Sequence, residues 1–233
     1  MRALYLLIAV LMTSAKIPAL NVEAVVHRLE ARYKNAKTLR AIFFESYGDG
    51  RGGRSAESGT VYFSRPGRMR WDYESPEKKL FLVDGTNVWL YVPADRTASR
   101  AKMSESSDWR TPLALLVGKA DLRKLCRELQ IVRMPDANAS SGERTDSSET
   151  TLRCIPRDAP LGDTTQQVLI EISPQDYLTR VVIHDEGDAT TEFRFGNWQE
   201  NLPVPESMFH FQPPQGVSIV DEESLLGEGQ QIR

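Results

Sequence analysis

The sequence predicts a mainly β protein that opens with a helix, an α+β chain dominated by antiparallel strands. Residues 59–93 contain three runs rich in aromatic and branched residues, separated by Pro-Gly, Ser-Pro and Asp-Gly turn signals. Such runs, bounded by Pro and Gly, are typical of an antiparallel meander. Alternating patterns return after residue 150, whereas residues 22–33 repeat at helical spacing. These observations favour one long β body behind a single clear helix.

The helix follows Asn21, a residue type suited to the N-cap position. The apolar residues behind it share one helical face: Val22, Val25, Val26, Leu29 and Tyr33. Because a helix of this length is marginal alone in water, its apolar stripe must pack against the rest of the protein.

Alternation divides the meander between two faces. The strand at 59–65 and the one that follows it place apolar residues on one face, namely Val61, Phe63, Met69, Trp71 and Tyr73. Arg68, Arg70 and Asp72 point the other way, which predicts a sheet with one wet face. With further strands at 39–44, 80–83 and 88–92, the first half supplies five strands and one large apolar face.

Strands recur in the second half of the chain, and the pattern predicts them near 151–155, 166–173, 178–185 and 190–198. Residues 121–132 fit either a helix or a strand. Residues 136–149 are polar and Ser-rich, which predicts a hairpin loop.

A second short helix signal lies at residues 111–118. Thr111 suits an N-cap, Pro112 the first helical position and Gly118 the end. The run from Leu113 to Val117 contains no polar residue. By composition alone, such a run is more typical of buried core than of a functional element.

Two cysteines, Cys126 and Cys154, flank the predicted hairpin loop. In an oxidising compartment they could form a disulfide, and two buried thiols are an equally good reading. No His lies near either residue in the sequence, so a metal site or a catalytic thiol is a poor fit.

The first residues are typical of an export signal. Residues 1–19 combine Arg2, an apolar run and candidate cleavage points after Ala15 and Ala19. No Cys follows either point, so no lipid attachment is predicted, and residues 20–233 are expected to form one exported domain. Loss of two basic residues with the signal changes the formal charge from −3 to −5. A net negative charge gives no electrostatic indication of a nucleic-acid partner.

Chemical motifs are scarce. The three histidines, His27, His184 and His210, lie far apart and lack metal-ligand spacing. The sequence contains neither a Gly-x-Ser-x-Gly elbow nor a phosphate-binding loop. We therefore expect no enzyme activity, no metal and no cofactor.

A set of ordered motifs resembles the LolA family of periplasmic lipoprotein carriers. They cover residues 21–221, with a weaker match over 126–163. The motifs are Arg65-Pro66, Met69-Arg70-Trp71, Ser75-Pro76, Asp84-Gly85, Val88-Trp89-Leu90-Tyr91, Thr111-Pro112-Leu113 and the ending from Phe209 to Val217.

The resemblance implies an incomplete antiparallel β-barrel with a helical lid over an apolar cavity. It also implies a monomeric periplasmic carrier of acylated lipoproteins. The cargo would come from an inner-membrane lipoprotein-releasing transporter and pass to an outer-membrane lipoprotein acceptor. Leu113 and Leu116 would belong to the lid, and Arg65 would latch the lid from the barrel wall. The expected cavity residues are Phe43, Val61, Phe63, Met69, Trp71 and Phe81.

Three alternatives remain open at the level of sequence. The same fold could be a carrier or a sensor of another amphiphile, such as a glycolipid, a polyketide or a lipidated peptide. It could hold an enzyme site, since fold does not fix function; titratable groups converging in the cavity would favour that. An interaction module would instead expose Trp89, Tyr91 and Trp109.

Overall fold

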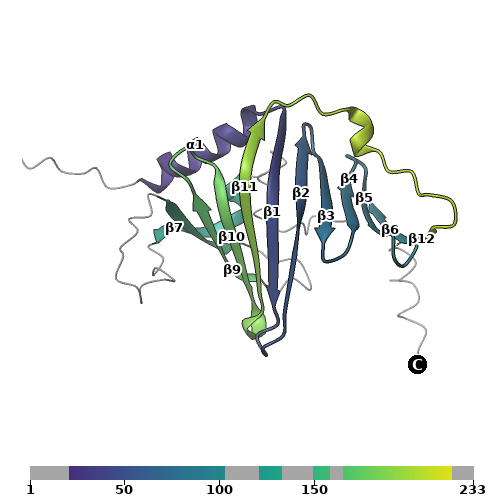
Figure 1. Ribbon diagram of the computed structural model, residues 1–233. Helices are drawn as coiled ribbons and strands as arrows, with labels where there is room; N and C mark the ends of the chain where they lie inside the picture. Colours follow the sequence, from purple (N-terminus) through teal and green to yellow (C-terminus); the bar gives the residue numbers. More distant parts are fainter. Residues whose placement is uncertain (1–20, 103–120, 133–148, 158–164, 222–233) are drawn as a thin grey trace, which may run out of the picture.

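The computed structural model describes residues 21–102, 121–132, 149–157 and 165–221, and the structural statements below concern these ranges. Figure 1 shows a large curved sheet with helix α1 lying near one of its ends. The predicted signal segment and the predicted lid residues Leu113 and Leu116 lie outside the described residues.

Twelve strands form one unclosed sheet in the order β12-β6-β5-β4-β3-β2-β1-β11-β10-β9-β8-β7. Neighbouring strands are antiparallel, except that β12 pairs with β6 in parallel. The strands are β1 (Thr38–Gly48), β2 (Arg54–Ser64), β3 (Arg68–Ser75), β4 (Lys79–Val83), β5 (Asn87–Val92), β6 (Thr97–Lys102), β7 (Cys126–Val132), β8 (Thr150–Pro156), β9 (Thr165–Ile172), β10 (Leu178–Asp185), β11 (Thr190–Glu200) and β12 (Ser218–Asp221). This arrangement confirms the mainly β prediction and fits an incomplete barrel.

Four helical segments accompany the sheet in the described ranges: α1 (Val22–Asn35), α3 (Leu122–Leu125), η2 (Glu186–Asp188) and η3 (Glu206–Phe209). The predicted cap of α1 is confirmed, because the Asn21 side chain accepts a 2.9 Å hydrogen bond from the Glu23 amide. The ambiguous segment at 121–132 contains both candidates, since α3 leads directly into β7.

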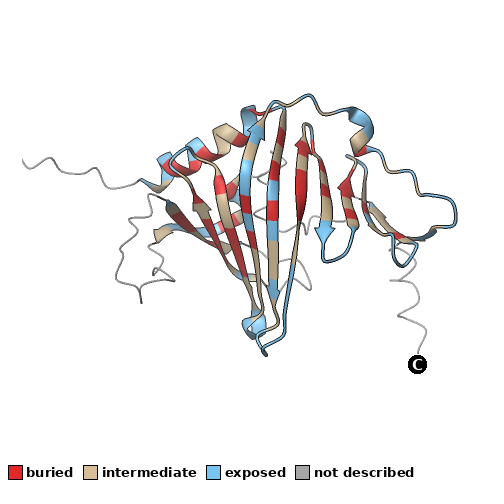
Figure 2. Cartoon of the chain, in the orientation of Figure 1, coloured by how far each residue is buried: buried red, intermediate tan, exposed pale blue. Residues whose placement is uncertain are grey.

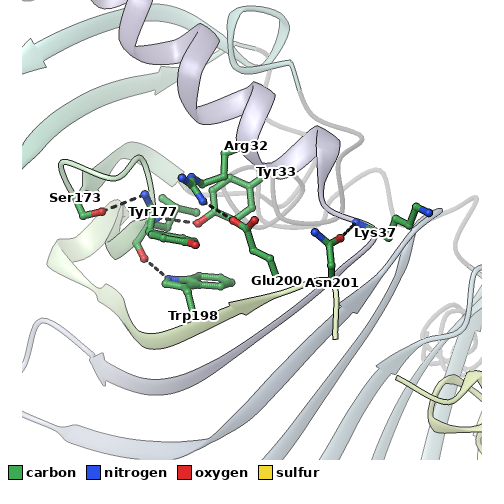
Figure 3. A network of polar contacts seen from close by, with 9 residues as sticks. Arg32, Tyr33, Lys37, Ser173, Tyr177, Trp198, Glu200 and Asn201 are labelled. Carbon is green, nitrogen blue, oxygen red and sulfur yellow. Dashed lines mark hydrogen bonds and ion pairs between the residues drawn. The ribbon is translucent and has the colours of Figure 1, made fainter. Parts of the chain in front are cut away.

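Helix α1 is fixed to β10 and β11 by the polar network shown in Figure 3. The buried Tyr33 hydroxyl accepts a 2.8 Å hydrogen bond from the Leu178 amide, and its ring meets Trp198 edge to face. Arg32 forms an ion pair with Glu200. Removing Tyr33 from water raises the pKa of its hydroxyl far above the usual value. The helix is therefore held by satisfied polar contacts as well as by its apolar stripe.

We call the side of the sheet that packs against α1 the inner face. The largest core cluster lies there and includes the predicted stripe of α1. Strands from both halves of the chain supply the rest, among them Leu152, Val168, Ile170, Val181, Ile183, Phe193 and Phe195. Alternation explains the selection, because successive side chains of a strand point to opposite faces.

The opposite side, the outer face, is not the uniformly wet surface that the sequence predicted. The C-terminal segment, residues 201–217, runs over β3 to β6 in Figure 1 and covers a second apolar cluster. Arg70 donates a 2.9 Å hydrogen bond to the Met208 carbonyl, and the Arg68 guanidinium lies 5.5 Å from the Phe209 ring centre. These cations were expected in water; instead they join the sheet to its C-terminal cover. Burial alternates along the strands in Figure 2.

The second cluster contains Leu80, Leu82, Trp89, Ala98 and Phe209. Strands β4 and β5 are thus apolar on both faces, because Phe81, Val83 and Val88 pack against the inner cluster. The sequence prediction of one large apolar face was too simple here. Two separate cores share the same short strands.

Cys126 and Cys154 form a disulfide between β7 and β8. The two antiparallel strands confirm the predicted hairpin, and both cysteines belong to the inner cluster. The question that the sequence left open is thereby answered in favour of the bond. The disulfide therefore cross-links the last two strands of the sheet, next to α3.

One turn and one strand position in the meander depend on particular residues. The Asp84 carboxylate accepts hydrogen bonds from the amides of Thr86 and Asn87 and from the Trp89 indole. Burial acts to raise the pKa of Asp84, but these hydrogen bonds outweigh it and hold the pKa below its ordinary value. At Gly59, inside β2, a Cβ would lie 1.9 Å from the Asp72 carbonyl oxygen, so only glycine fits at this point, where the register between β2 and β3 shifts.

Candidate ligand-binding face

The predicted wall residues come together on the inner face. Phe43, Val61, Phe63, Met69 and Trp71 all belong to its core cluster and are at most 4% exposed. Their strands β1, β2 and β3 are adjacent in the sheet. The remaining predicted wall residue, Phe81 on β4, is half-buried against the same cluster.

Aromatic rings are concentrated around Trp71. The Phe43 ring centre lies 4.7 Å from it in an edge-to-face arrangement, and Phe193 and Phe195 approach from β11 at 5.7 and 6.1 Å. The sequence prediction missed the two β11 residues. Their alternation within 190–198 placed them on one face, but nothing in the sequence showed that β11 pairs with β1.

The buried part of this face is apolar. Among the described residues, no Asp, Glu, His, Lys or Arg is buried. Charged side chains meet the rim of the cluster at Tyr73, which donates a hydrogen bond to Glu45 and lies under the Lys79 ammonium group. The described residues also contain no group of three or more His, Cys, Asp or Glu side chains placed to hold a metal ion. The buried part of the face can shelter apolar groups.

The predicted latch residue, Arg65, follows β2 and reaches the end of α1. Its Nε donates a 2.6 Å hydrogen bond to the Ala36 carbonyl, and its amide donates to the Lys37 carbonyl at 3.0 Å. Ala36 is the C-cap of α1, where a cation is favoured by the helix dipole. Partial burial of the guanidinium lowers the pKa of Arg65 from its usual value. The predicted lid at 113–117 lies outside the described residues, and the contact of Arg65 with α1 was not predicted.

A groove of about 810 Å³ lies on the outer face between the meander and the C-terminal segment. Its walls mix apolar rings such as Tyr91 and Phe211 with Asp72, Lys79 and His210. Asp72 and Lys79 form ion pairs with Arg70 and Glu57. An alkyl chain would take these polar groups out of water, which makes the groove a poor host for it. Trp89 nearby is 7% exposed and packs on Phe211, so its ring is not available for a docking patch.

The described helices are all too short or too polar to cross a bilayer. Comparison with known proteins places the inner face in context. A family model described as "Outer membrane lipoprotein carrier protein LolA" matches residues 34–212, most of the chain. The chain belongs to the LolA family.

Relatives of this LolA-family chain are named for the same role. An outer-membrane lipoprotein carrier protein of Nitrosospira multiformis is 29% identical over 195 residues, 83% of this chain and 87% of the relative. One of Bordetella avium is 31% identical over 165 residues, 71% of each chain. A crystal structure of an uncharacterized conserved protein from Thermus thermophilus shares the fold, with a TM-score of 0.51 at 12% identity, covering 85% of this chain and 98% of the other.

Proposed function

We propose that this protein is a periplasmic carrier for the acyl chains of lipoproteins. It would receive them when an inner-membrane transporter releases a lipoprotein and hand them to an acceptor at the outer membrane. The protein would act as a monomer and catalyse no covalent step. Membership of the LolA family and the names of the relatives support this assignment.

The observation that carries the proposal is the chemistry of the inner face. Six neighbouring strands, β3 to β9 in sheet order, present buried apolar side chains toward α1, and none of the described Asp, Glu, His, Lys or Arg residues is buried. Each methylene transferred from water to such a surface gains about 0.8 kcal/mol. A chain with roughly 14 sheltered methylenes would gain on the order of 11 kcal/mol, less the cost of displacing whatever covers the face when empty.

Arg65 gives this carrier a means of release. A carrier that binds too tightly cannot deliver, so a contact that favours the closed, empty state helps it unload. Arg65 joins the end of β2 to the end of α1 through the Ala36 carbonyl. We therefore assign Arg65 a role in the balance between open and closed states, with Leu113 and Leu116 in the lid.

Native mass spectrometry of protein gently extracted from the periplasm tests the assignment. A co-purifying lipoprotein is the expected result; a glycolipid or polyketide in its place would redirect the assignment to another amphiphile. Adjacent residues on β1 provide a matched pair for binding of a triacylated lipopeptide. Phe43 is buried on the inner face, whereas Phe44 is 46% exposed on the outer face. Phe43→Leu should weaken binding and Phe44→Leu should not; equal affinities would contradict the assignment.

A further inference from the structure

One buried polar atom on the inner face has no partner. The indole Nε1 of Trp71 is inaccessible to solvent and forms no hydrogen bond. The whole residue is only 2% exposed. Buried tryptophan N–H groups usually find an acceptor, and leaving one without costs stability. The atom therefore calls for a physical explanation.

The other two described tryptophans show what is missing. Trp89 donates its indole hydrogen to Asp84 at 3.1 Å, and Trp198 donates to the Leu178 carbonyl at 2.7 Å. The hydroxyl of Tyr33, on α1, also belongs to the inner cluster and accepts a hydrogen bond from the Leu178 amide. Within the described part of the inner cluster, Trp71 is the one residue whose buried donor lacks an acceptor.

The surroundings explain why the protein itself does not satisfy this donor. Trp71 is packed against the rings of Phe43, Phe193 and Phe195, which carry no acceptor oxygen. The nearby Tyr73 hydroxyl donates a 2.9 Å hydrogen bond to Glu45 and does not serve as the acceptor of the indole. A donor kept in such a site is suited to an acceptor that arrives with an apolar ligand.

An acyl chain brings such an acceptor. Its alkyl part is purely apolar, but the chain begins at an ester or amide carbonyl whose oxygen also loses its water partners when the chain is buried. A bond between that oxygen and the indole would satisfy both groups at once. An alkyl ether of the same length carries no carbonyl and gains less.

We propose that the Trp71 Nε1–H group donates a hydrogen bond to a carbonyl oxygen of the bound acyl chain. Trp71 is then a specificity residue that distinguishes acyl chains from alkyl chains and fixes how deep the chain lies against β3. This inference rests on the proposed carrier function. Its neighbours across the sheet, Val61 on β2 and Phe81 on β4, place the indole inside the wall rather than at its edge.

The test combines two ligands with two proteins. The ligands are a cysteinyl lipopeptide with two ester-linked palmitoyl chains and the matching lipopeptide with two ether-linked hexadecyl chains. The proteins are the wild type and a Trp71→3-benzothienylalanine variant, in which sulfur replaces the N–H group while ring size is kept. Binding is measured by isothermal titration or by displacement of a fluorescent fatty acid.

We expect the wild type to bind the diester roughly 3- to 10-fold more tightly than the diether, as one net hydrogen bond predicts. In the Trp71 variant the ratio should fall to about 1 while affinity for the diether stays unchanged. The same replacement at Trp89, whose N–H group is already bonded to Asp84 on the outer face, should leave the ratio as in the wild type.

A second measurement uses the unmodified protein and does not depend on the variant folding. The indole ¹H–¹⁵N signal of Trp71 should move downfield with the diester and not with the diether, while the signals of Trp89 and Trp198 stay in place. An N-palmitoylated diether that restores the shift identifies the amide carbonyl as the acceptor; otherwise the ester carbonyl is assigned.

The results separate the inference from the carrier function. Tight binding of both ligands, with the same diester-to-diether affinity ratio in the wild type and the Trp71 variant and an unmoved Trp71 indole signal, overturns the inference alone. Failure of both ligands to bind the wild type overturns the carrier function as well.

Discussion

Replacing Arg65 with leucine tests whether the contact between the end of β2 and the end of α1 governs release of a ligand. The substitution removes the 2.6 Å hydrogen bond to the Ala36 carbonyl. The amide of residue 65 keeps its bond to the Lys37 carbonyl, because that bond belongs to the backbone. The fold should therefore survive, and the change should act on the docking of the helix end.

The expected magnitude follows from the kind of bond. A hydrogen bond with a charged donor contributes about 1.5–3 kcal/mol, more than a neutral one. Since about 1.4 kcal/mol is a factor of ten, the open state should gain roughly 10- to 150-fold in relative population. If the protein expels its ligand by returning to the closed state, the rate of ligand dissociation should fall by a similar factor.

The assay follows a fluorescent acyl lipopeptide as it passes from the carrier to acceptor vesicles. The Arg65→Leu protein should bind the probe at least as tightly as the wild type and release it at least roughly ten times more slowly. Arg68→Leu is the matched control, because Arg68 lies on the neighbouring strand but contacts Phe209 on the outer face. Wild-type transfer rates in the Arg65 variant, with an unchanged circular dichroism spectrum, would refute the latch.

Three further predictions concern stability. The double substitution Cys126→Ala, Cys154→Ala removes a bond spanning 28 positions, and the free energy of unfolding in urea should fall by about 3–4 kcal/mol. Gly59→Ala forces a Cβ against the Asp72 carbonyl and should cost about 1–3 kcal/mol or prevent folding. Asp84→Asn should make the free energy of unfolding depend less on pH in the acid range. The pKa of Asp84 is lower in the folded than in the unfolded state. Its stabilising contribution is therefore present above the unfolded-state pKa and is lost as pH falls through the folded-state pKa.

Each of these predictions has a control or a contrary result. Treating the wild type with a reductant should reproduce the double cysteine variant, and equal stability with and without the bond would contradict the estimate. Gly48→Ala serves beside Gly59→Ala, since a Cβ at Gly48 meets nothing within 4 Å. For Asp84→Asn, a stability curve at acid pH parallel to that of the wild type would exclude a special role of this carboxylate.

Much of the sheet could be predicted because its strands alternate. Strand β3 presents a regular apolar face that can be recognised without knowledge of its neighbours. Strand β6, Thr97–Lys102, escaped prediction because its only apolar residues are two alanines, which point to opposite faces. Strand β12 is only four residues long and pairs with β6, which lies far away in the sequence, so no local pattern predicts it.

The site shows the same division between local and distant information. The inner-face positions of Val61, Phe63 and Trp71 followed from alternation alone. That Phe193 would pack against Trp71, and that Arg65 would reach Ala36, depended on pairings between distant segments. The missing acceptor of the Trp71 indole could be recognised only once its neighbours were known.

The cover on the outer face explains how the inner face can remain available to a ligand. A strand that is apolar on both sides must be buried on both sides to stay in place. The C-terminal segment buries Leu82 and Trp89 from outside, so β4 and β5 keep one packed core even if contacts on the inner face change. The Asp84 turn joins these two strands and is bonded to the same Trp89. The meander can thus serve as a rigid wall, and exchange of a ligand against Trp71 would leave the second core, and the register of β4 and β5, intact.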